Sequence, residues 1–267
     1  MPGRVQEYWE RRAAKEGASH TATTNDVYLR ELEIRTCVDA LRSAPGGPVS
    51  SVLDVGCGDG YSTLALARAM PGTRFVGVDY SSNMIAQARR ALDEAALGDR
   101  VSFRVADATR LADDLPSGSF DAVTTMRCLI NLETLEAQAT AMGAIAAVLK
   151  PGGTLIAFEN FMEGQDDLTR ARERMGLPPI PVRWHNRFFT EAEFGTITAP
   201  HFEGLDFSDF ASGYYYVTRV LYSAMCKAND QEPDYRHDIH RFGVELPPTG
   251  RFSPVRLATA RRRAGQP

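Results

Sequence analysis

The sequence predicts an α/β fold in which an open, mostly parallel β-sheet carries helices on both faces. Strand-like apolar segments alternate with helix-like segments between residues 51 and 159, and such alternation is typical of βαβ units. A glycine-rich turn, Gly56-Cys-Gly-Asp-Gly60, follows the first of these strands and precedes a helix. Open sheets of this kind bind ligands at the carboxyl ends of their strands.

The expected elements follow one another with short connections. A helix with apolar residues three and four positions apart runs from Leu29 to Leu41, and Pro45-Gly-Gly-Pro48 ends it. The expected strands are Ser51–Val55, Arg74–Val78, Val101–Val105, Phe120–Thr125 and Gly153–Glu159. The expected helices between them are Ser62–Ala69, Asn83–Ala95 and Leu135–Leu149.

Beyond Glu159 the regular alternation ends. Residues 161–187 contain three prolines and are expected to be irregular, whereas Thr190-x-x-Glu193 is a capping box that predicts a short helix. The later expected elements are a strand at Gly204–Phe210, a helix at Tyr214–Lys227 and a strand at Pro254–Ala260. We therefore expect one domain over residues 1–267, with insertions at 161–187 and 212–250 that cap the substrate side of the sheet.

Composition limits the class of protein. The chain has 30 basic and 34 acidic residues and a net charge of −4, which argues against a nucleic-acid-binding surface. No apolar stretch is long enough to span a bilayer, and the N-terminus is too polar for a signal peptide. A cytoplasmic protein without a membrane partner is expected. The four cysteines form no CxxC pair, so neither a metal site nor a disulfide framework is expected.

Acidic residues at the strand ends narrow the choice of ligand. Asp79 ends the second expected strand, where a carboxylate can accept hydrogen bonds from ribose hydroxyls, and Asp107 ends the third, near an adenine amino group. A glycine loop alone is weak evidence for a ligand, because a plain tight βα turn is an alternative explanation. A nicotinamide fingerprint would require glycine at position 61, where the chain has Tyr61. Asp54 would repel a pyrophosphate and suits a ligand with an ammonium group.

Together these segments resemble the Rossmann-like, class I S-adenosylmethionine-dependent methyltransferases from about Ser51 to Glu159. The resemblance implies S-adenosylmethionine as cofactor and a seven-stranded sheet whose last strand, Pro254–Ala260, is antiparallel beside Gly204–Phe210. It also implies an N-terminal helical lid over residues 1–44. The cofactor-binding residues that it implies are Asp54, Gly56, Cys57, Gly58, Asp79, Tyr80, Met84, Asp107, Ala108 and Arg127.

Two residues are candidates for proton transfer, and each has a plainer alternative. His185 lies in a polar, Trp-flanked loop and could deprotonate a hydroxyl or orient an amine; the alternative is a surface histidine held by a backbone hydrogen bond. Glu159 could bind an amine or act as a base, or could simply order a loop.

The expected substrate-binding residues are Asn131, Asn160, Trp184, Tyr215, Arg219 and Tyr222. The last three form a stripe on one helix, which plain packing also explains. Thr23-Thr-Asn-Asp26 and Arg30 could line the lid.

The sequence therefore predicts transfer of a methyl group from S-adenosylmethionine to nitrogen or oxygen of a small metabolite. Because the donor is already activated, alignment and exclusion of water contribute most, and a general base helps when the acceptor carries a proton. The expected partners are a small-molecule substrate and a second copy of the chain in a homodimer. One alternative is methylation of protein or RNA, which the acidic charge and the lid-like insertions disfavour. Another is a non-catalytic regulatory subunit that binds the same cofactor.

Overall fold

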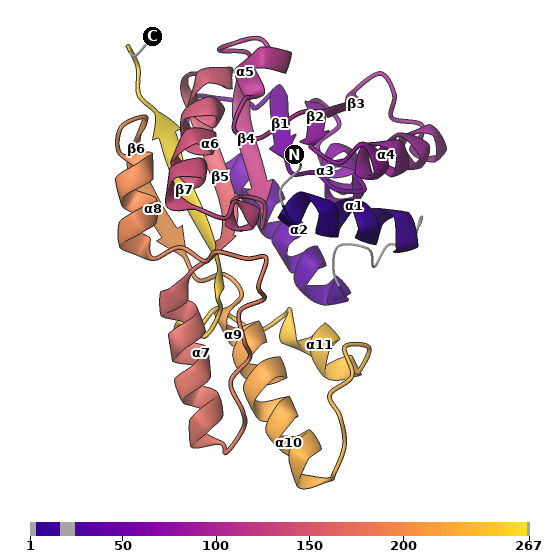
Figure 1. Ribbon diagram of the computed structural model, residues 1–267, viewed down its shortest axis with the longest axis vertical. Coiled ribbons are helices and arrows are strands. Elements are labelled where there is room, and N and C mark those ends of the chain that lie inside the picture. The colour runs from indigo at the N-terminus through magenta and orange to yellow at the C-terminus, as the bar shows by residue number, and fades with distance from the viewer. Residues whose placement is uncertain (1–3, 17–24, 266–267) are drawn as a thin grey trace.

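The computed structural model describes residues 4–16 and 25–265, and in that part of the chain seven strands form one sheet (Figure 1). The strand order is β3-β2-β1-β4-β5-β7-β6; β1 to β5 pair in parallel, and β7 is antiparallel to both β5 and β6. The predicted fold, with its antiparallel last strand, is confirmed. The strands are β1 (Ser51–Val55), β2 (Arg74–Asp79), β3 (Val101–Val105), β4 (Phe120–Met126), β5 (Leu149–Asn160), β6 (Phe202–Ser208) and β7 (Val255–Arg262).

Helices cover both faces of the sheet. One face packs against α2 (Val27–Arg42), α3 (Tyr61–Ala69) and α4 (Ser82–Ala95), and the other packs against α5 (Leu111–Asp114), α6 (Leu135–Val148) and α8 (Glu191–Thr198). The predicted capping box at Thr190 begins α8. The remaining helical segments are α1 (Arg4–Glu16), the 3₁₀ turn η1 (Leu129–Asn131), α7 (Met162–Arg174), α9 (Ser212–Tyr215), the π-helix η2 (Tyr216–Leu221), α10 (Tyr222–Ala228) and α11 (Asp238–Gly243). None of the helices in the described ranges is long and apolar enough to cross a membrane.

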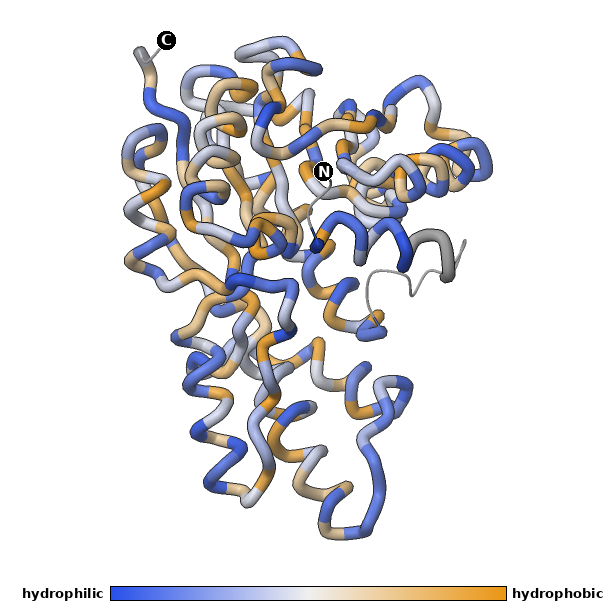
Figure 2. The backbone as a smooth tube through the Cα atoms, in the orientation of Figure 1, coloured by the Kyte–Doolittle hydropathy of each residue, from blue (hydrophilic) through white to orange (hydrophobic). Residues whose placement is uncertain are grey.

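Strand periodicity explains why two separate cores form. Successive side chains of a strand point to opposite faces of its sheet, and accordingly Leu155 and Ile156 of β5 belong to the two different apolar clusters. The central strands are pale to orange in the hydropathy-coloured tube, whereas the segment between α10 and α11 is blue (Figure 2). The sheet is therefore buried between helices on both of its faces.

The segment after β5 differs from its expected irregular conformation, because residues Met162–Arg174 form α7. The buried positions of this helix are Gly164, Gln165, Leu168 and Arg172, so its inner stripe contains a single large aliphatic side chain. Helix prediction relies on apolar residues three and four positions apart. A helix whose buried stripe is mostly polar lacks that signal.

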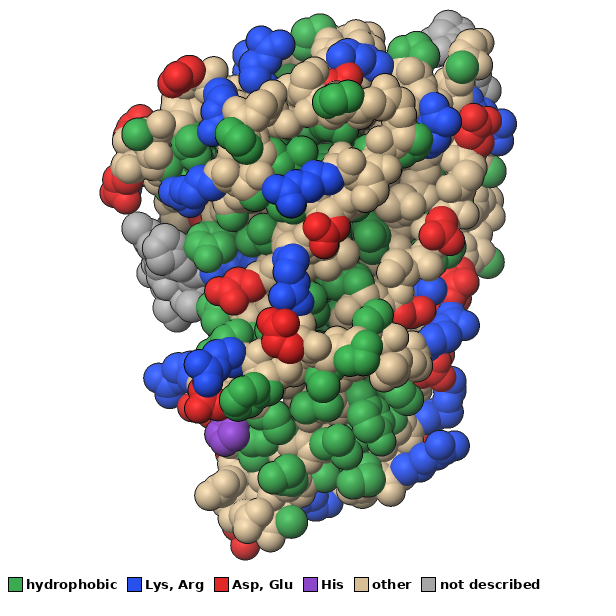
Figure 3. Space-filling view, turned by 180° about the vertical axis from the view of Figure 1, so that it is seen from behind, with side chains coloured by type: hydrophobic (Ala, Val, Ile, Leu, Met, Phe, Trp, Pro, Cys, Tyr) green, Lys and Arg blue, Asp and Glu red, His purple; other side chains and the backbone are tan. Residues whose placement is uncertain are grey.

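The segments α7, α9, η2, α10 and α11 lie together below the sheet in Figure 1, and we call them the cap. Hydrophobic side chains gather on the lower part of the molecule when it is seen from behind (Figure 3). The exposed Leu221, Met225, Phe242 and Leu246 all belong to segments of the cap or to the turn after α11. The cap is thus a distinct layer that adjoins the carboxyl edge of the sheet.

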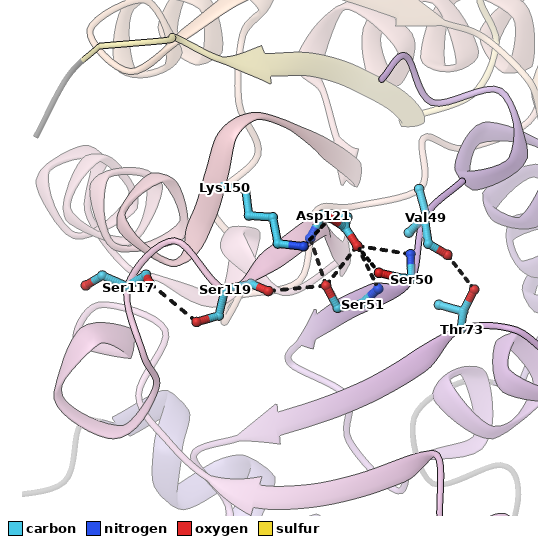
Figure 4. Close-up of polar contacts among 8 residues, drawn as sticks. All are labelled: Val49, Ser50, Ser51, Thr73, Ser117, Ser119, Asp121 and Lys150. Carbon is cyan, nitrogen blue, oxygen red and sulfur yellow. Dashed lines mark hydrogen bonds and ion pairs between the residues drawn. The ribbon is translucent and has the colours of Figure 1, made fainter. Parts of the chain in front are cut away.

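Asp121 fastens the opposite, amino-terminal edge of the sheet (Figure 4). Its carboxylate accepts hydrogen bonds from the backbone N–H and the hydroxyl of both Ser50 and Ser51, and it pairs with Lys150 Nζ at 2.5 Å. Burial alone would raise the pKa of Asp121, but the bonds from Lys150 and the two serines lower it well below the usual 3.8. Asp121 therefore joins the start of β4 to the starts of β1 and β5.

Replacing Asp121 by alanine is expected to lower the free energy of unfolding at pH 7 by about 2–3 kcal/mol, because several charge-assisted hydrogen bonds are lost. A lowered carboxyl pKa stabilises the fold above pH 3.8, and this stabilisation is lost as pH falls toward the lowered value. The difference between the variant and the wild type should therefore shrink at pH 3 in urea titrations. Asp113→Ala, which breaks an exposed pair with Arg110, should change stability by less than about 0.5 kcal/mol; equal losses would contradict this role.

Candidate active site

A cavity of about 430 Å³ lies at the carboxyl ends of β1, β2, β4 and β5, between the sheet and the cap. Residues of α1 and α2 close it from a third side, among them Trp9 and Asp26. Its volume is in the range of small-molecule and cofactor sites, and its place is the edge where open α/β sheets bind ligands. We take this cavity as the candidate active site.

The glycine loop after β1 forms the floor of the cavity. Gly56, Gly58 and Gly60 have φ angles of 75°, 54° and 78°, which side chains other than glycine rarely adopt. The backbone N–H groups of Gly56 and Cys57 donate to the carbonyl of Val78 at 2.8 and 3.0 Å. These bonds hold the loop against the end of β2.

Asp79, the last residue of β2, is fixed beside this loop. Its two carboxylate oxygens accept hydrogen bonds from Gly58 N at 3.0 Å and Ser81 N at 2.9 Å. Burial raises the pKa of Asp79 to about 6, although both backbone hydrogen bonds act in the opposite direction. Each oxygen keeps a further lone pair, so the carboxylate can still accept hydrogen bonds from ribose hydroxyls.

Asp54, which is only 2% exposed, lies deeper in the cavity wall. Its carboxylate accepts hydrogen bonds from the hydroxyls of Thr63 at 2.5 Å and Thr124 at 3.0 Å. Burial raises the pKa of Asp54, while the two threonine hydroxyls lower it. Asp54 thus joins the start of α3 to β4. It also places a carboxylate where the resemblance to methyltransferases predicts the ammonium group of the cofactor.

Most of the predicted cofactor residues meet in the cavity wall, and the group they form suits S-adenosylmethionine. The hydroxyl of Tyr80 is buried without a hydrogen-bond partner among the described residues, as expected of an atom that serves a ligand. The predicted cofactor residues that line the cavity are Asp54, Gly56, Cys57, Gly58, Asp79, Tyr80, Met84 and Arg127. No set of three or more side chains suited to a metal ion occurs in the described part of the chain.

Asp107 and Ala108 follow β3 but do not line the cavity. Asp107 Oδ1 accepts hydrogen bonds from the backbone N–H and the hydroxyl of Thr109, both at 2.8 Å. The carboxylate therefore orders the turn after β3. The contact of these two residues with the adenine edge stays a prediction.

His185 lies in the cavity wall beneath α1. Its ring is stacked on Tyr8 at 4.5 Å and meets the edge of Trp9 at 5.6 Å, and its Nδ1 is buried without a partner in the described ranges. Burial, followed by the charges of Arg183 and Arg12, lowers the pKa of His185 below 6.5. The imidazole is therefore neutral at pH 7 and able to accept a proton.

Trp184 differs from its prediction as a substrate-binding residue. Its side chain does not line the cavity and is 53% exposed, with the guanidinium of Arg4 lying 4.4 Å from its ring centroid. Trp184 and His185 lie in a turn that is closed by a hydrogen bond from Asn186 N to the carbonyl of Arg183, and their rings meet edge to face at 5.4 Å. Trp184 instead packs against α1 from outside.

Glu159 does not fit its predicted role as a catalytic base. It is fully buried outside the cavity lining, and its carboxylate accepts hydrogen bonds from the Thr125 hydroxyl and from the backbone N–H groups of residues 128, 129 and 130. Neighbouring residues of a strand point to opposite faces, so only Asn160 faces the cavity. Burial raises the pKa of Glu159 to about 7, and its role is to order the turn after β4.

The stripe predicted on the cap helix is interrupted by a change of helix type. Tyr215 and Arg219 line the cavity, but Tyr222 does not; its hydroxyl accepts a hydrogen bond from Asp234 N at 3.3 Å. The spacing of four and then three residues assumes a regular α-helix, whereas residues 216–221 form a π-helix. The wider turn rotates Tyr222 away from the cavity.

Several lining residues come from α2 and the lid region. Asp26 and Arg30 line the cavity as expected, whereas Thr23 and Thr24 lie outside the described residues. Glu33, which the sequence interpretation missed, is fully buried and pairs with Arg127 at 2.9 Å. A signal was available, because Glu33 follows Leu29 by four positions and is the one acid in an otherwise apolar row of that helix.

Comparisons with known proteins agree with this geometry. Residues 52–153 match the methyltransferase domain family. The chain is similar to a demethylmenaquinone methyltransferase of Thermus thermophilus, 40% identical over 126 residues that cover 47% of this chain and 52% of that protein. It is also similar to a ubiquinone biosynthesis O-methyltransferase of Xanthomonas campestris, 39% identical over 108 residues that cover 40% and 42%. The matches span about half the length of these relatives or less.

Solved structures show the same fold at low sequence identity. The [4+2]-cyclase SpnF has a TM-score of 0.58 and 24% identity, with 87% of this chain and 81% of that one covered. An O-methyltransferase family protein of Burkholderia thailandensis has a TM-score of 0.56 and 16% identity, with 96% and 63% covered. The fold and the position of the cavity are those of a Rossmann-like α/β domain, and residues 52–153 of this domain resemble a methyltransferase domain.

Proposed function

We propose that this protein transfers a methyl group from S-adenosylmethionine to a nitrogen or oxygen atom of a small molecule. This proposal rests mainly on one observation. The glycine loop and Asp79 line the same cavity as residues of the cap such as Tyr215 and Arg219. The names of the two curated relatives, a demethylmenaquinone methyltransferase and a ubiquinone biosynthesis O-methyltransferase, support a small acceptor.

The residues of this chain act mainly by binding and alignment. When bound, the cofactor supplies a methyl group activated by its sulfonium. Asp79 would hold the ribose, Asp54 and the glycine loop would hold the methionine end, and the cap would exclude water. Holding the two reactants in a reactive geometry can lower a barrier by up to about 7–11 kcal/mol.

His185 is the residue that we propose to accept the proton of the acceptor. It lines the same cavity, it is neutral because burial lowers its pKa, and α1 holds its ring in place. A positioned base of this kind contributes about 10²–10⁴-fold when the acceptor carries a proton. Glu159, the other predicted base, is bound on both oxygens by protein donors.

His185→Asn is expected to lower kcat at least about tenfold while leaving the affinity for S-adenosylhomocysteine within about threefold of wild type. In the wild type, kcat/KM should fall as pH drops through the lowered pKa of His185, because protonation removes the base. The variant should lack this acidic limb. His237→Asn, at an exposed histidine that caps α11, is the control. Normal turnover in His185→Asn would remove this residue as the base.

The proposed function is tested by incubating the protein with methyl-labelled S-adenosylmethionine and a small-metabolite extract. Label should enter small molecules and not added protein or RNA. Tight cofactor binding without transfer of label would instead support a regulatory subunit. One fold can carry unrelated chemistries, and the [4+2]-cyclase SpnF shares this fold, so the transfer itself has to be measured.

A further inference from the structure

Two guanidinium–carboxylate pairs lie where α2 and the residue after β4 meet the cap in the cavity wall. We call this part of the cavity the acceptor end. Arg127 donates to Glu33 at 2.9 Å, and Arg219 of the cap donates to Asp26, the residue that caps the start of α2. All four residues line the cavity. Tyr215 lies near both guanidinium groups, whose charges act on its hydroxyl.

Protein donors occupy three of the four carboxylate oxygens in these pairs. One oxygen of Asp26 accepts from Leu29 N at 3.0 Å and from the Tyr214 hydroxyl at 2.6 Å, and the other accepts from Arg219. Glu33 is fully buried behind Arg127, which donates to its Oε2, while its Oε1 has no partner in the described part of the chain. Both oxygens of Asp26 are therefore occupied, and one oxygen of Glu33 is not.

The guanidinium groups, in contrast, keep donors to spare. A guanidinium has five N–H donors, whereas one hydrogen bond joins each of these two to its carboxylate, and Arg127 Nε is buried without a partner in the described part of the chain. The side chains of Arg127 and Arg219 are 28% and 12% exposed. The unused donors of these two guanidinium groups thus favour a ligand that supplies acceptor atoms.

Arg219 is held rigidly for such a contact. Its guanidinium lies 4.7 Å from the ring centroid of Tyr235, 5.6 Å from that of Tyr215 and 5.8 Å from that of Tyr214. The aromatic rings and Asp26 fix its position before a ligand arrives, so little side-chain freedom is lost on binding. Arg30, by comparison, lies over Tyr61 directly after the glycine loop and so belongs to the cofactor end.

Apolar and aromatic side chains line much of the rest of this part of the cavity, beside polar ones such as Gln165, Arg183 and Asn186. The apolar and aromatic residues come from α7, the loop after it, α9 and the segment between α10 and α11: Leu168, Ile180, Pro181, Phe188, Tyr215 and Tyr235. Such a wall suits a planar or aliphatic body, and a guanidinium pairs well with a planar carboxylate.

We propose that Arg127, predicted from the sequence to bind the cofactor, acts instead with Arg219 to bind a carboxylate of the methyl acceptor, so that the acceptor is a small carboxylic acid with an aromatic or otherwise apolar body. This inference rests on the proposed function, because it assigns the acceptor of the same site. It narrows the substrate class from small molecules in general to small apolar carboxylic acids.

The test uses benzoate and its neutral analogue benzamide as probes on the full chain saturated with S-adenosylhomocysteine. In ligand-observed NMR titrations, benzoate should bind at least about tenfold more tightly than benzamide. Arg219→Gln should weaken benzoate about tenfold and leave S-adenosylhomocysteine within about threefold. Arg236→Gln, at a cap arginine that is 90% exposed, should change neither affinity.

A second variant keeps the test decisive if Arg219→Gln does not fold. Arg219→Lys keeps the charge beside Asp26 but loses the planar N–H fork, so it should reduce the preference for benzoate over benzamide without abolishing it. Equal binding of the two probes to the wild type, or unchanged benzoate binding in both variants, overturns the carboxylate subsite while S-adenosylhomocysteine still binds. Absence of S-adenosylhomocysteine binding overturns the proposed function and this inference with it.

Discussion

Asp79→Ala is expected to weaken S-adenosylhomocysteine binding about 30- to 100-fold, or 2–3 kcal/mol, because a charge-assisted acceptor for the ribose is lost. The loss of affinity also has a second cause, which lies in the glycine loop. Asp79 also accepts hydrogen bonds from Gly58 N and Ser81 N, and without them the glycine loop is less well ordered. Isothermal titration calorimetry of the variant and the wild type measures the combined effect.

The pH dependence of the affinity for S-adenosylhomocysteine distinguishes the contribution of the Asp79 carboxylate from the other contributions to binding. The pKa of Asp79 is raised to about 6 by burial, and ribose hydroxyls donate to the ionised form. Binding of the ligand therefore favours loss of the proton, and wild-type affinity should fall as pH decreases through about 6. Asp79→Ala should show no such change between pH 5 and pH 8.

Asp93→Ala is the matched control, because Asp93 is exposed on α4, the helix that follows β2. Its affinity for S-adenosylhomocysteine should equal that of the wild type at every pH. An Asp79→Ala variant with unchanged affinity would mean that this carboxylate is not the ribose ligand.

The sheet was predictable because its signals are local. The predicted bounds of β1 and β3 match the structure residue for residue, and those of β2 and β4 differ by a single residue at one end. Each strand is a short apolar run next to a turn, and neither feature depends on distant residues. The glycine loop could be predicted for the same reason, because its glycines and the preceding Asp54 lie in one continuous segment of the sequence.

The acceptor end could not be predicted in the same way, because it depends on contacts between distant segments. Glu33 and Arg127 are 94 positions apart, and Arg219 and Asp26 are 193 positions apart. The orientation of a side chain at a strand end also decides its role. Glu159 was predicted as a base and its neighbour Asn160 as a substrate-binding residue, but only Asn160 faces the cavity.

The π-helix has a similar consequence for the cap. The sequence of residues 216–221 gives no sign that their hydrogen bonds skip five residues instead of four. The π-helix η2 packs against α7 and α11, and Arg219 lies within it. The departure from regular helix thus coincides with the residue that we place against the acceptor.

Gly56→Ala is expected to weaken S-adenosylhomocysteine binding by about 100-fold or more and to lower the free energy of unfolding by about 2–4 kcal/mol. Gly56 has a φ of 75°, and an added Cβ would lie 2.4 Å from Cys128 Sγ and 2.6 Å from Cys128 Cβ. The conformational cost and the steric clash act together, so the glycine loop must shift from its position in the cavity floor. Calorimetric titration and urea unfolding measure the two effects.

Gly118→Ala separates these two causes. Gly118 also has a positive φ, 61°, but an added Cβ there would meet nothing closer than 4.0 Å, and its turn lies before β4, at the edge of the sheet away from the cavity. This variant should lose only about 1–2 kcal/mol of stability and should bind S-adenosylhomocysteine normally. If Gly56→Ala behaved like Gly118→Ala in both measurements, the close approach of the loop to Cys128 would not be what shapes the cofactor site.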